Sequence, residues 1–105
     1  MSLIYVICQD EEEARNIGIK LLKKRLCACV NIIDGISSLS FWPPKSDTIH
    51  EAQETILLIK TIKENFAEIN KEILELHSYE VPCVFSVDAV DVDGKYFNWL
   101  CKQIG

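Results

Sequence analysis

The stretch Thr55-Ile-Leu-Leu-Ile-Lys-Thr-Ile62 decides the fold, because its apolar, β-branched centre predicts a strand in the middle of a sheet. Earlier in the chain, one long strand is predicted over Ala28–Ile33 and residues 36–42. Asp34-Gly35 interrupts it, and a glycine inside a strand often marks a bulge or a sharp bend. Two prolines end that strand, and the polar run Lys45–Gln53 predicts a hairpin loop between the two strands.

Further strands and helices are predicted on both sides of this hairpin. Leu3–Cys8 is almost wholly apolar and predicts a strand buried on both faces. Asp10–Leu26 has apolar residues at helical spacing behind an acidic cap, and Ile62–His77 repeats that spacing until Pro82 prevents continuation. Val84–Val90 predicts a fourth strand, and Tyr96–Ile104 a short terminal helix.

The order strand, helix, strand, strand, helix, strand is typical of an α+β, ferredoxin-like fold, in which one antiparallel sheet carries both helices on one face. The 105 residues fit one domain, residues 1–105. One short C-terminal helix is too small to cover the other face of the sheet. The sequence therefore predicts that a partner subunit covers it.

Composition narrows the possible partners and the compartment. A net charge of −5 and a pI near 4.9 argue against nucleic acid and anionic membrane surfaces as partners. No apolar run reaches the ~20 residues of a membrane-spanning helix, and no export signal is visible, which predicts a cytoplasmic protein. An odd number of cysteines without a C-x-x-C pair predicts reduced thiols, not a disulfide framework or a zinc ribbon.

Six segments, in order along the chain, resemble the CutA divalent-cation-tolerance family. They are Asp10–Ala14, Arg25–Ile32, Ser38–Trp42, Glu54–Thr61, His77–Pro82 and Tyr96–Trp99. The resemblance implies a homotrimer, tolerance of divalent cations with binding of copper or another divalent metal, and a likeness to PII-type regulators. The sequence departs from the family pattern at Pro43–Lys45, where the hairpin tip usually contains glycine, at Ser78, where proline is usual, and at Cys83, where glutamate is common.

His77, Glu80 and Cys83 are the predicted metal site, because imidazole, carboxylate and thiolate can each bind a first-row metal. Of the copper ligands that the resemblance implies, only His77 matches. Leu76 stands at the second histidine position, and Cys8 is displaced by two residues from the expected cysteine. The alternative for His77 is structural, since a histidine at a helix C-terminus can bind the last carbonyls.

Trp42, Lys60, Tyr79 and Glu80 are the predicted ligand or subunit cleft, because they fall in segments that form the subunit-boundary cleft in relatives. The alternative is structural pairing across the trimer, with Lys60 next to Glu80. Cys27 and Cys29 could form a soft-metal pair, but core packing is the favoured interpretation, and Cys101 is given the same one.

Two functions remain open, and neither is enzymatic, because no nucleophile–base constellation or phosphate-binding glycine loop is present. The first is a CutA-like homotrimer that responds to metal ions and binds copper or another divalent metal. The second is a PII-like trimeric regulatory module that binds a small ligand or a protein partner at the cleft, with no physiological metal. The sequence does not identify any protein partner other than the chain itself.

Overall fold

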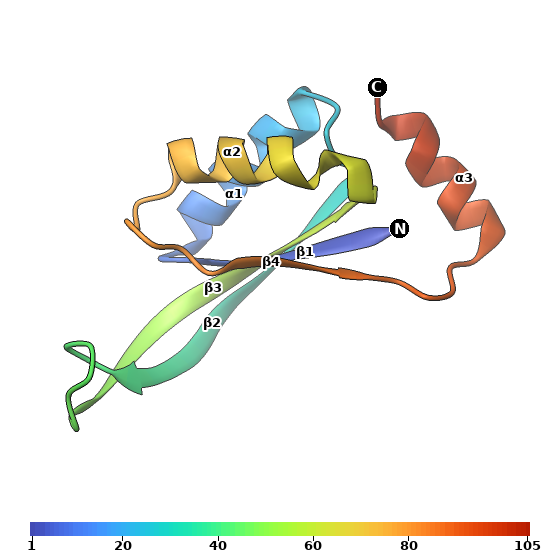
Figure 1. Cartoon of the computed structure of the whole chain (residues 1–105). Helices are drawn as coiled ribbons and strands as arrows, with labels where there is room; N and C mark the ends of the chain where they lie inside the picture. Colours follow the sequence, from blue (N-terminus) through green and yellow to red (C-terminus); the bar gives the residue numbers. More distant parts are fainter.

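The computed structural model describes residues 1–105 and contains four strands and three α-helices. In chain order they are β1 (Ser2–Cys8), α1 (Glu11–Lys23), β2 (Cys29–Phe41), β3 (Ile49–Thr61), α2 (Phe66–Leu76, after a 3₁₀ turn at Lys63–Asn65), β4 (Val84–Asp88) and α3 (Gly94–Gln103) (Figure 1). The strands form one antiparallel sheet in the order β2-β3-β1-β4. This confirms the predicted ferredoxin-like fold.

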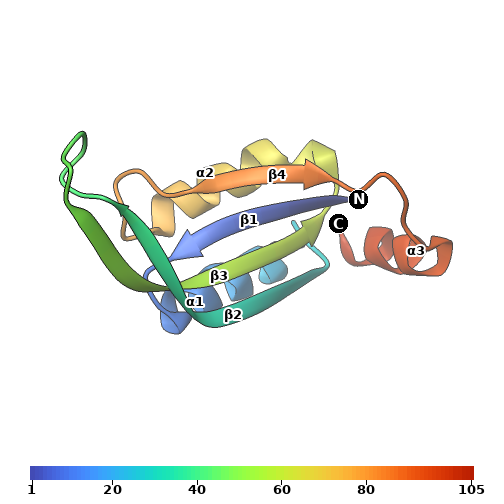
Figure 2. The same ribbon diagram turned by 90° about the horizontal axis from the view of Figure 1, so that it is seen from below.

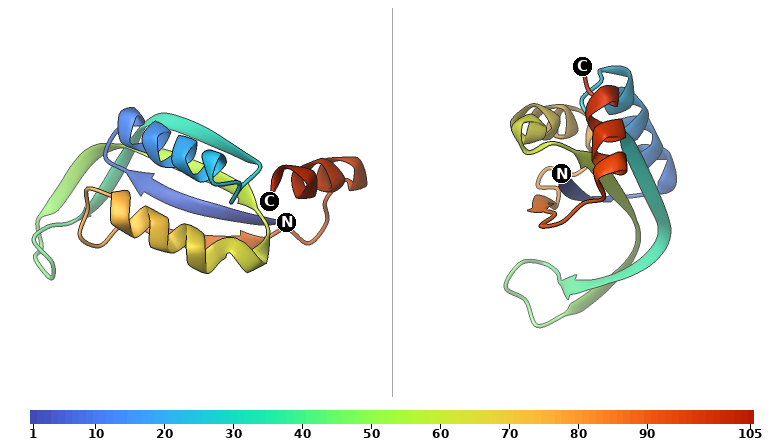
Figure 3. Two further views of the ribbon diagram at one scale, coloured as in Figure 1. Left: turned by 90° about the horizontal axis from the view of Figure 1, so that it is seen from above. Right: turned by 90° about the vertical axis from the view of Figure 1, so that its right-hand side faces the viewer.

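Both long helices lie on one face of the sheet, as Figures 2 and 3 show. Their apolar stripes meet the inward side chains of β1 and β3 in a single core. Its fully buried members include Ile4, Val6, Ile17, Leu21, Leu57, Ile59, Ile69 and Ile73. The third helix packs beside one end of the sheet through Leu100 and leaves the second face of the sheet free.

The second face of the sheet is mostly apolar, with Asn31 and Lys60 as polar exceptions, and it is only partly covered in the single chain. Every second residue of β1 is half-buried there, so the prediction that β1 is buried on both faces is wrong for one chain alone. We call this surface the open face. It comprises Leu3, Tyr5, Ile7, Ile33, Ile56, Leu58, Phe85 and Val87, which the strand register sets opposite one another. Tyr5 and Phe85 stack on it with ring centroids 4.9 Å apart.

The β2–β3 hairpin is longer than the sheet and bends away from the side that carries the helices (Figures 1 and 3). The register shifts between Ile33 and Ile36, where Gly35 adopts φ +71°, a left-handed conformation that glycine tolerates best. Thr55 Oγ1 donates to Asp34 Oδ1 at 2.7 Å across this bulge. The predicted bend is therefore confirmed.

Several predicted boundaries differ from the structure, and among them α1 ends at Lys23 and not at Leu26, and α2 begins at Phe66 and not at Ile62. Residues 49–53 belong to β3 and not to the hairpin loop, because they pair with residues 37–41. The fourth strand ends at Asp88 and not at Val90, because its partner strand begins at Ser2, the residue opposite Asp88. The terminal helix starts two residues earlier than predicted, because the Asp93 side chain accepts from the backbone N–H of Tyr96 and caps it.

No helix in the structure combines the length and the apolarity that crossing a bilayer requires.

Candidate functional site

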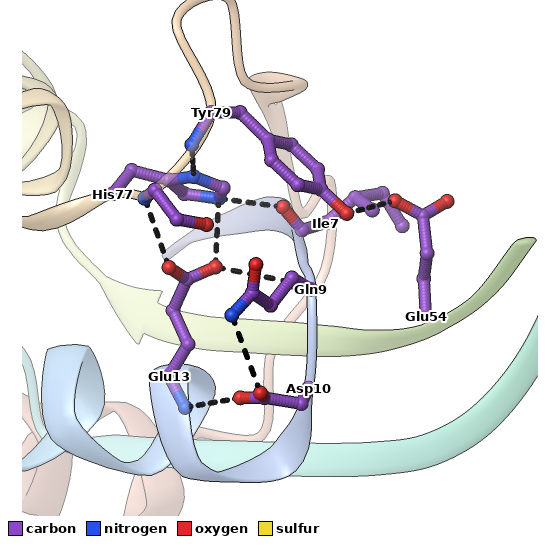
Figure 4. Close-up of polar contacts among 8 residues, drawn as sticks. Ile7, Gln9, Asp10, Glu13, Glu54, His77 and Tyr79 are labelled. Atoms are coloured by element: carbon purple, nitrogen blue, oxygen red, sulfur yellow. Dashed lines mark hydrogen bonds and ion pairs between the residues drawn. The ribbon is translucent and has the colours of Figure 1, made fainter.

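A polar cluster lies where β1 ends, α1 begins and α2 ends (Figure 4). Asp10 caps α1, and its Oδ1 accepts from the backbone N–H of Glu13 at 2.8 Å. The Glu13 carboxylate turns back, so that its Oε1 accepts from the backbone N–H of Gln9 at 3.0 Å. These two hydrogen bonds fix the Glu13 carboxylate at the head of α1.

His77 lies beside this carboxylate with its side chain fully buried. Its Nδ1 accepts from the backbone N–H of Tyr79 at 3.0 Å, which leaves the ring proton on Nε2. Nε2 then donates to the carbonyl oxygen of Ile7, the acceptor 2.7 Å away. The imidazole thus joins the end of α2 to the end of β1, and not to the last carbonyls of its own helix as the structural alternative supposed.

The Glu13 carboxylate holds the same junction from the other side. Its Oε2 accepts from the backbone N–H of Ser78 at 2.9 Å, and its Oε1 lies 3.6 Å from His77 Nε2. Partial burial acts to raise the pKa of Glu13, but the hydrogen bonds from Ser78 and Gln9 and the neighbouring His77 outweigh it. The net effect is a Glu13 pKa below its usual value.

This lowered pKa predicts a specific acid sensitivity. A carboxylate with a depressed folded-state pKa stabilises the protein above its unfolded-state pKa of about 4.3, and that stability is lost as pH falls through the folded-state pKa. We expect Glu13→Gln to be less stable than wild type at pH 7, with a difference that shrinks below about pH 4. Urea unfolding between pH 3 and 7 measures it, and Glu12→Gln, an exposed neighbour, is the matched control. Equal pH dependence in all three proteins would contradict the prediction.

The structure brings together one cluster of potential metal ligands, and it differs from the predicted set. Single ligand atoms of Cys8, Glu13 and His77 lie within 4.8 Å of one another. Of the predicted set, Glu80 and Cys83 are exposed and do not join His77 in such a cluster. Sequence reasoning missed Cys8 because it counted residues along the chain, whereas pairing of Cys8 with Thr55 fixes its place at the end of β1.

Whether this cluster fits a metal depends on its free lone pairs. Both ring nitrogens of His77 and both oxygens of Glu13 are already engaged with backbone groups. Burial, together with the charges of Glu13 and Asp10, raises the pKa of the Cys8 thiol to about 12, whereas a metal binds the thiolate. The three side chains therefore do not fit a metal in this arrangement, since a metal on His77 would require breaking one of the two hydrogen bonds of its ring nitrogens.

A groove of ≈ 770 Å³ lies where the inner side of the hairpin faces the loop before β4. Trp42, Tyr79 and Glu80, three of the four predicted cleft residues, line it together. Sequence reasoning missed its other lining residues, which are Ser38, Ser40, Pro44, His50, Ala52, Glu54 and Val81. Those on β2 and β3 are spaced by two residues, which places them on one side of the hairpin. This signal was missed because Lys45–Gln53 was interpreted as a loop.

Lys60, the fourth predicted cleft residue, does not line the groove. It lies at the other end of β3, where its Nζ is 5.8 Å from the centroid of the Tyr96 ring on α3. This is a cation–π distance. Within one chain, Lys60 and Glu80 form no ion pair.

Tyr79 connects the groove to the His77 junction. Its backbone N–H binds His77 Nδ1, and its phenol donates to Glu54 Oε2 at 2.6 Å. Burial, followed by the hydrogen bond to Glu54 and its charge, raises the pKa of the phenol above its usual value, so Tyr79 stays neutral. The position of this groove wall is thus set by the same contacts that close the junction (Figure 4).

The remaining cysteines behave differently from one another. Cys27 is buried in the core as favoured, and burial together with Cys29 raises its pKa to about 11. Cys29 is only partly buried, at the start of β2. The core interpretation of Cys101 is wrong, because the buried side of α3 is taken by Leu100 and the next residue turns to solvent.

These features define a class of protein, a small ferredoxin-like domain with a long bent hairpin and a groove at the hairpin's inner side. Residues 2–103 match the model of the family described as CutA1 divalent ion tolerance protein. The chain belongs to this family.

Full-length relatives and solved structures agree. The chain is 36% identical over 104 residues to the divalent-cation tolerance protein CutA of Thermotoga maritima, with 99% of each chain covered. It is 35% identical over 103 residues to that of Archaeoglobus fulgidus, with 98% of this chain and 97% of the relative covered. The crystal structure of Pyrococcus horikoshii CutA in guanidine hydrochloride superposes with a TM-score of 0.92 at 31% identity, and all of each chain is covered. The structure of the Thermus thermophilus protein gives 0.90 at 32%, again over the whole of both chains.

Proposed function

We propose that this chain supports divalent-cation tolerance as a homotrimeric, non-catalytic regulatory module that acts in the cytoplasm through its groove. The observation that carries the proposal is the groove itself, which three separate segments build and which Tyr79 ties to the His77 junction. A ligand or partner segment seated there would contact the bent hairpin and the loop before β4 together. This position suits a regulatory module, because a bound ligand would touch both of these segments at once.

The open face supports the trimer. Phe85 and Val87 are about half-exposed on it, at 46% and 51%, and Ile33 is 46% exposed. A continuous apolar surface of this kind is typical of an interface and unusual for the free surface of a monomer. In a homotrimer, symmetry would repeat the same contact three times, so that the open face of each copy would be buried.

The cytoplasm is proposed because all five cysteines are free thiols. Among relatives, the Archaeoglobus fulgidus structure is described as periplasmic and a rice relative as chloroplastic. The compartment therefore differs within the family.

A resident metal is the second candidate function, favoured by the proximity of Cys8, Glu13 and His77. The predicted set of His77, Glu80 and Cys83 binding copper or another divalent metal also remains a prediction. Both sets depend on a free ring nitrogen of His77, which the observed hydrogen bonds do not leave.

Copper titration of the reduced, tag-free protein separates the two candidates. We expect wild type and His77→Gln to give the same Cu(I) and Cu(II) isotherms, because neither ring nitrogen of His77 has a free lone pair for a metal. Glutamine can keep hydrogen bonds at this position, so the variant stays folded. Loss of one metal equivalent in His77→Gln would favour the resident metal.

A bacterial growth experiment tests the proposed role in divalent-cation tolerance. In a bacterial strain lacking its own CutA-family protein, grown across copper, zinc and cadmium, we expect wild type and His77→Gln to restore tolerance. We expect Trp42→Ala, which removes an exposed wall of the groove, to fail although it folds and assembles. Full tolerance with Trp42→Ala would show that the groove is not the working site.

A further inference from the structure

We propose that the groove binds a small organic cation, an alkylammonium or a quaternary ammonium ion. This inference rests on the proposed function of the groove and names the chemical class of its ligand. Its volume of ≈ 770 Å³ lies within the range of about 300–1,000 Å³ that is typical of small-molecule sites.

The charge of the lining favours a cation. Glu54 and Glu80 both line the groove, and none of its lining residues is a lysine or an arginine. Neither carboxylate takes part in an ion pair within the chain, where the pairs of opposite charge are Arg15–Glu11 and Lys24–Glu72. A phosphate or carboxylate ligand would meet two carboxylates and no lysine or arginine. The groove therefore selects against anions.

The aromatic residues of the lining favour an organic cation over a bare metal ion. Trp42 lines the groove and is 60% exposed in the single chain, and tryptophan is the side chain whose face attracts cations best. Tyr79 supplies a second aromatic wall, and its hydroxyl is already committed to Glu54. The phenol proton satisfies one oxygen of Glu54, and the other oxygen keeps its capacity to accept from an ammonium group. Aromatic walls with adjacent carboxylates are the chemistry that recognises ammonium ions.

A second copy of the chain is the competing occupant. Ala52 and Glu54 follow the same alternation on β3 as Ile56 and Leu58, so the groove is continuous with the open face. Assembly could therefore bring a lysine of another copy to the groove, and Lys60 lies on the same side of β3. For this reason the test uses the assembled protein and includes a variant without that lysine.

The test is a ligand-observed NMR titration with choline as the probe. Its control ligand is 3,3-dimethylbutan-1-ol, which has the same shape without the charge, and inorganic phosphate is the anionic control. We expect choline to bind saturably, the neutral alcohol to bind at least about tenfold more weakly, and phosphate not to bind. Removing one carboxylate by Glu80→Gln should weaken choline binding about fivefold, and Trp42→Leu should weaken it further.

The matched control is Glu51→Gln, which makes the same charge change on the same strand but on the side away from the groove. It should bind choline as wild type does. Equal binding of choline and the neutral alcohol, absence of choline binding, or equal losses in Glu80→Gln and Glu51→Gln would each overturn the proposal. Binding that appears only in Lys60→Gln would show that another copy fills the groove, and would overturn it too. These results are independent of the growth and oligomer tests, so this inference can fail while the regulatory trimer stands.

Discussion

Replacing His77 by alanine is expected to lower the free energy of unfolding by about 2–4 kcal/mol, because it removes two buried hydrogen bonds and leaves a cavity. The imidazole is fully buried and joins the Ile7 carbonyl to the backbone N–H of Tyr79. Without it, both backbone groups lose a partner in a site that the surrounding side chains keep from water. The melting temperature should fall by about 10 °C or more, measured by thermal unfolding followed by circular dichroism.

Two variants show whether this loss comes from the hydrogen bonds. His77→Gln keeps a donor and an acceptor and should recover part of the lost stability. Ser78→Ala changes the next residue but keeps its backbone N–H, which donates to Glu13. This variant should lower the free energy of unfolding by less than about 1 kcal/mol. An alanine at position 77 as stable as wild type would show that the junction does not depend on the imidazole.

The elements of the fold were predictable because their periodicity is strong. The apolar centre of Thr55–Ile62 and the helical spacing after Asp10 each have one reasonable interpretation. The length of the hairpin was not predictable, because Ile49–Gln53 is polar and mostly exposed on both sides. This segment is a strand because it pairs with the end of β2. The strand propensity of one segment does not reveal which segment it pairs with.

The site was predictable where it depends on neighbouring residues and not where it depends on register. Tyr79 and Glu80 belong to one loop, and within one chain that loop lines the groove together with Trp42. Lys60 does not line the groove of its own chain, because β3 runs the length of the sheet and carries Lys60 to the end where α3 packs. Likewise, the proximity of Cys8 to His77 depends on where β1 and α2 end in space, and the spacing of residues along the chain does not show this.

A lysine in the middle of the open face is expected to abolish the proposed trimer. Leu58 lies on β3 between Tyr5 on one neighbouring strand and Asn31 on the other, and its neighbours Leu57 and Ile59 point into the core beneath the helices. In the trimer, Leu58→Lys would place an unpaired ammonium group in each copy of the buried contact. The cost is about 3–5 kcal/mol for each such charge, which a cooperative assembly meets three times.

The monomer itself should tolerate this change, because position 58 is only half-buried in the single chain and a lysine there can reach water. We therefore expect sedimentation equilibrium at micromolar concentration to give a trimer for wild type and a folded monomer for Leu58→Lys. Ile19→Lys makes the same substitution at a 43%-exposed position on α1, away from the sheet, and should remain trimeric. A wild-type monomer, or a trimer that survives Leu58→Lys, would mean that the open face is not the contact and that its apolar residues need another explanation. If the trimer is lost in Leu58→Lys and kept in Ile19→Lys, then a neighbouring copy covers the side of β1 that is left open in a single chain.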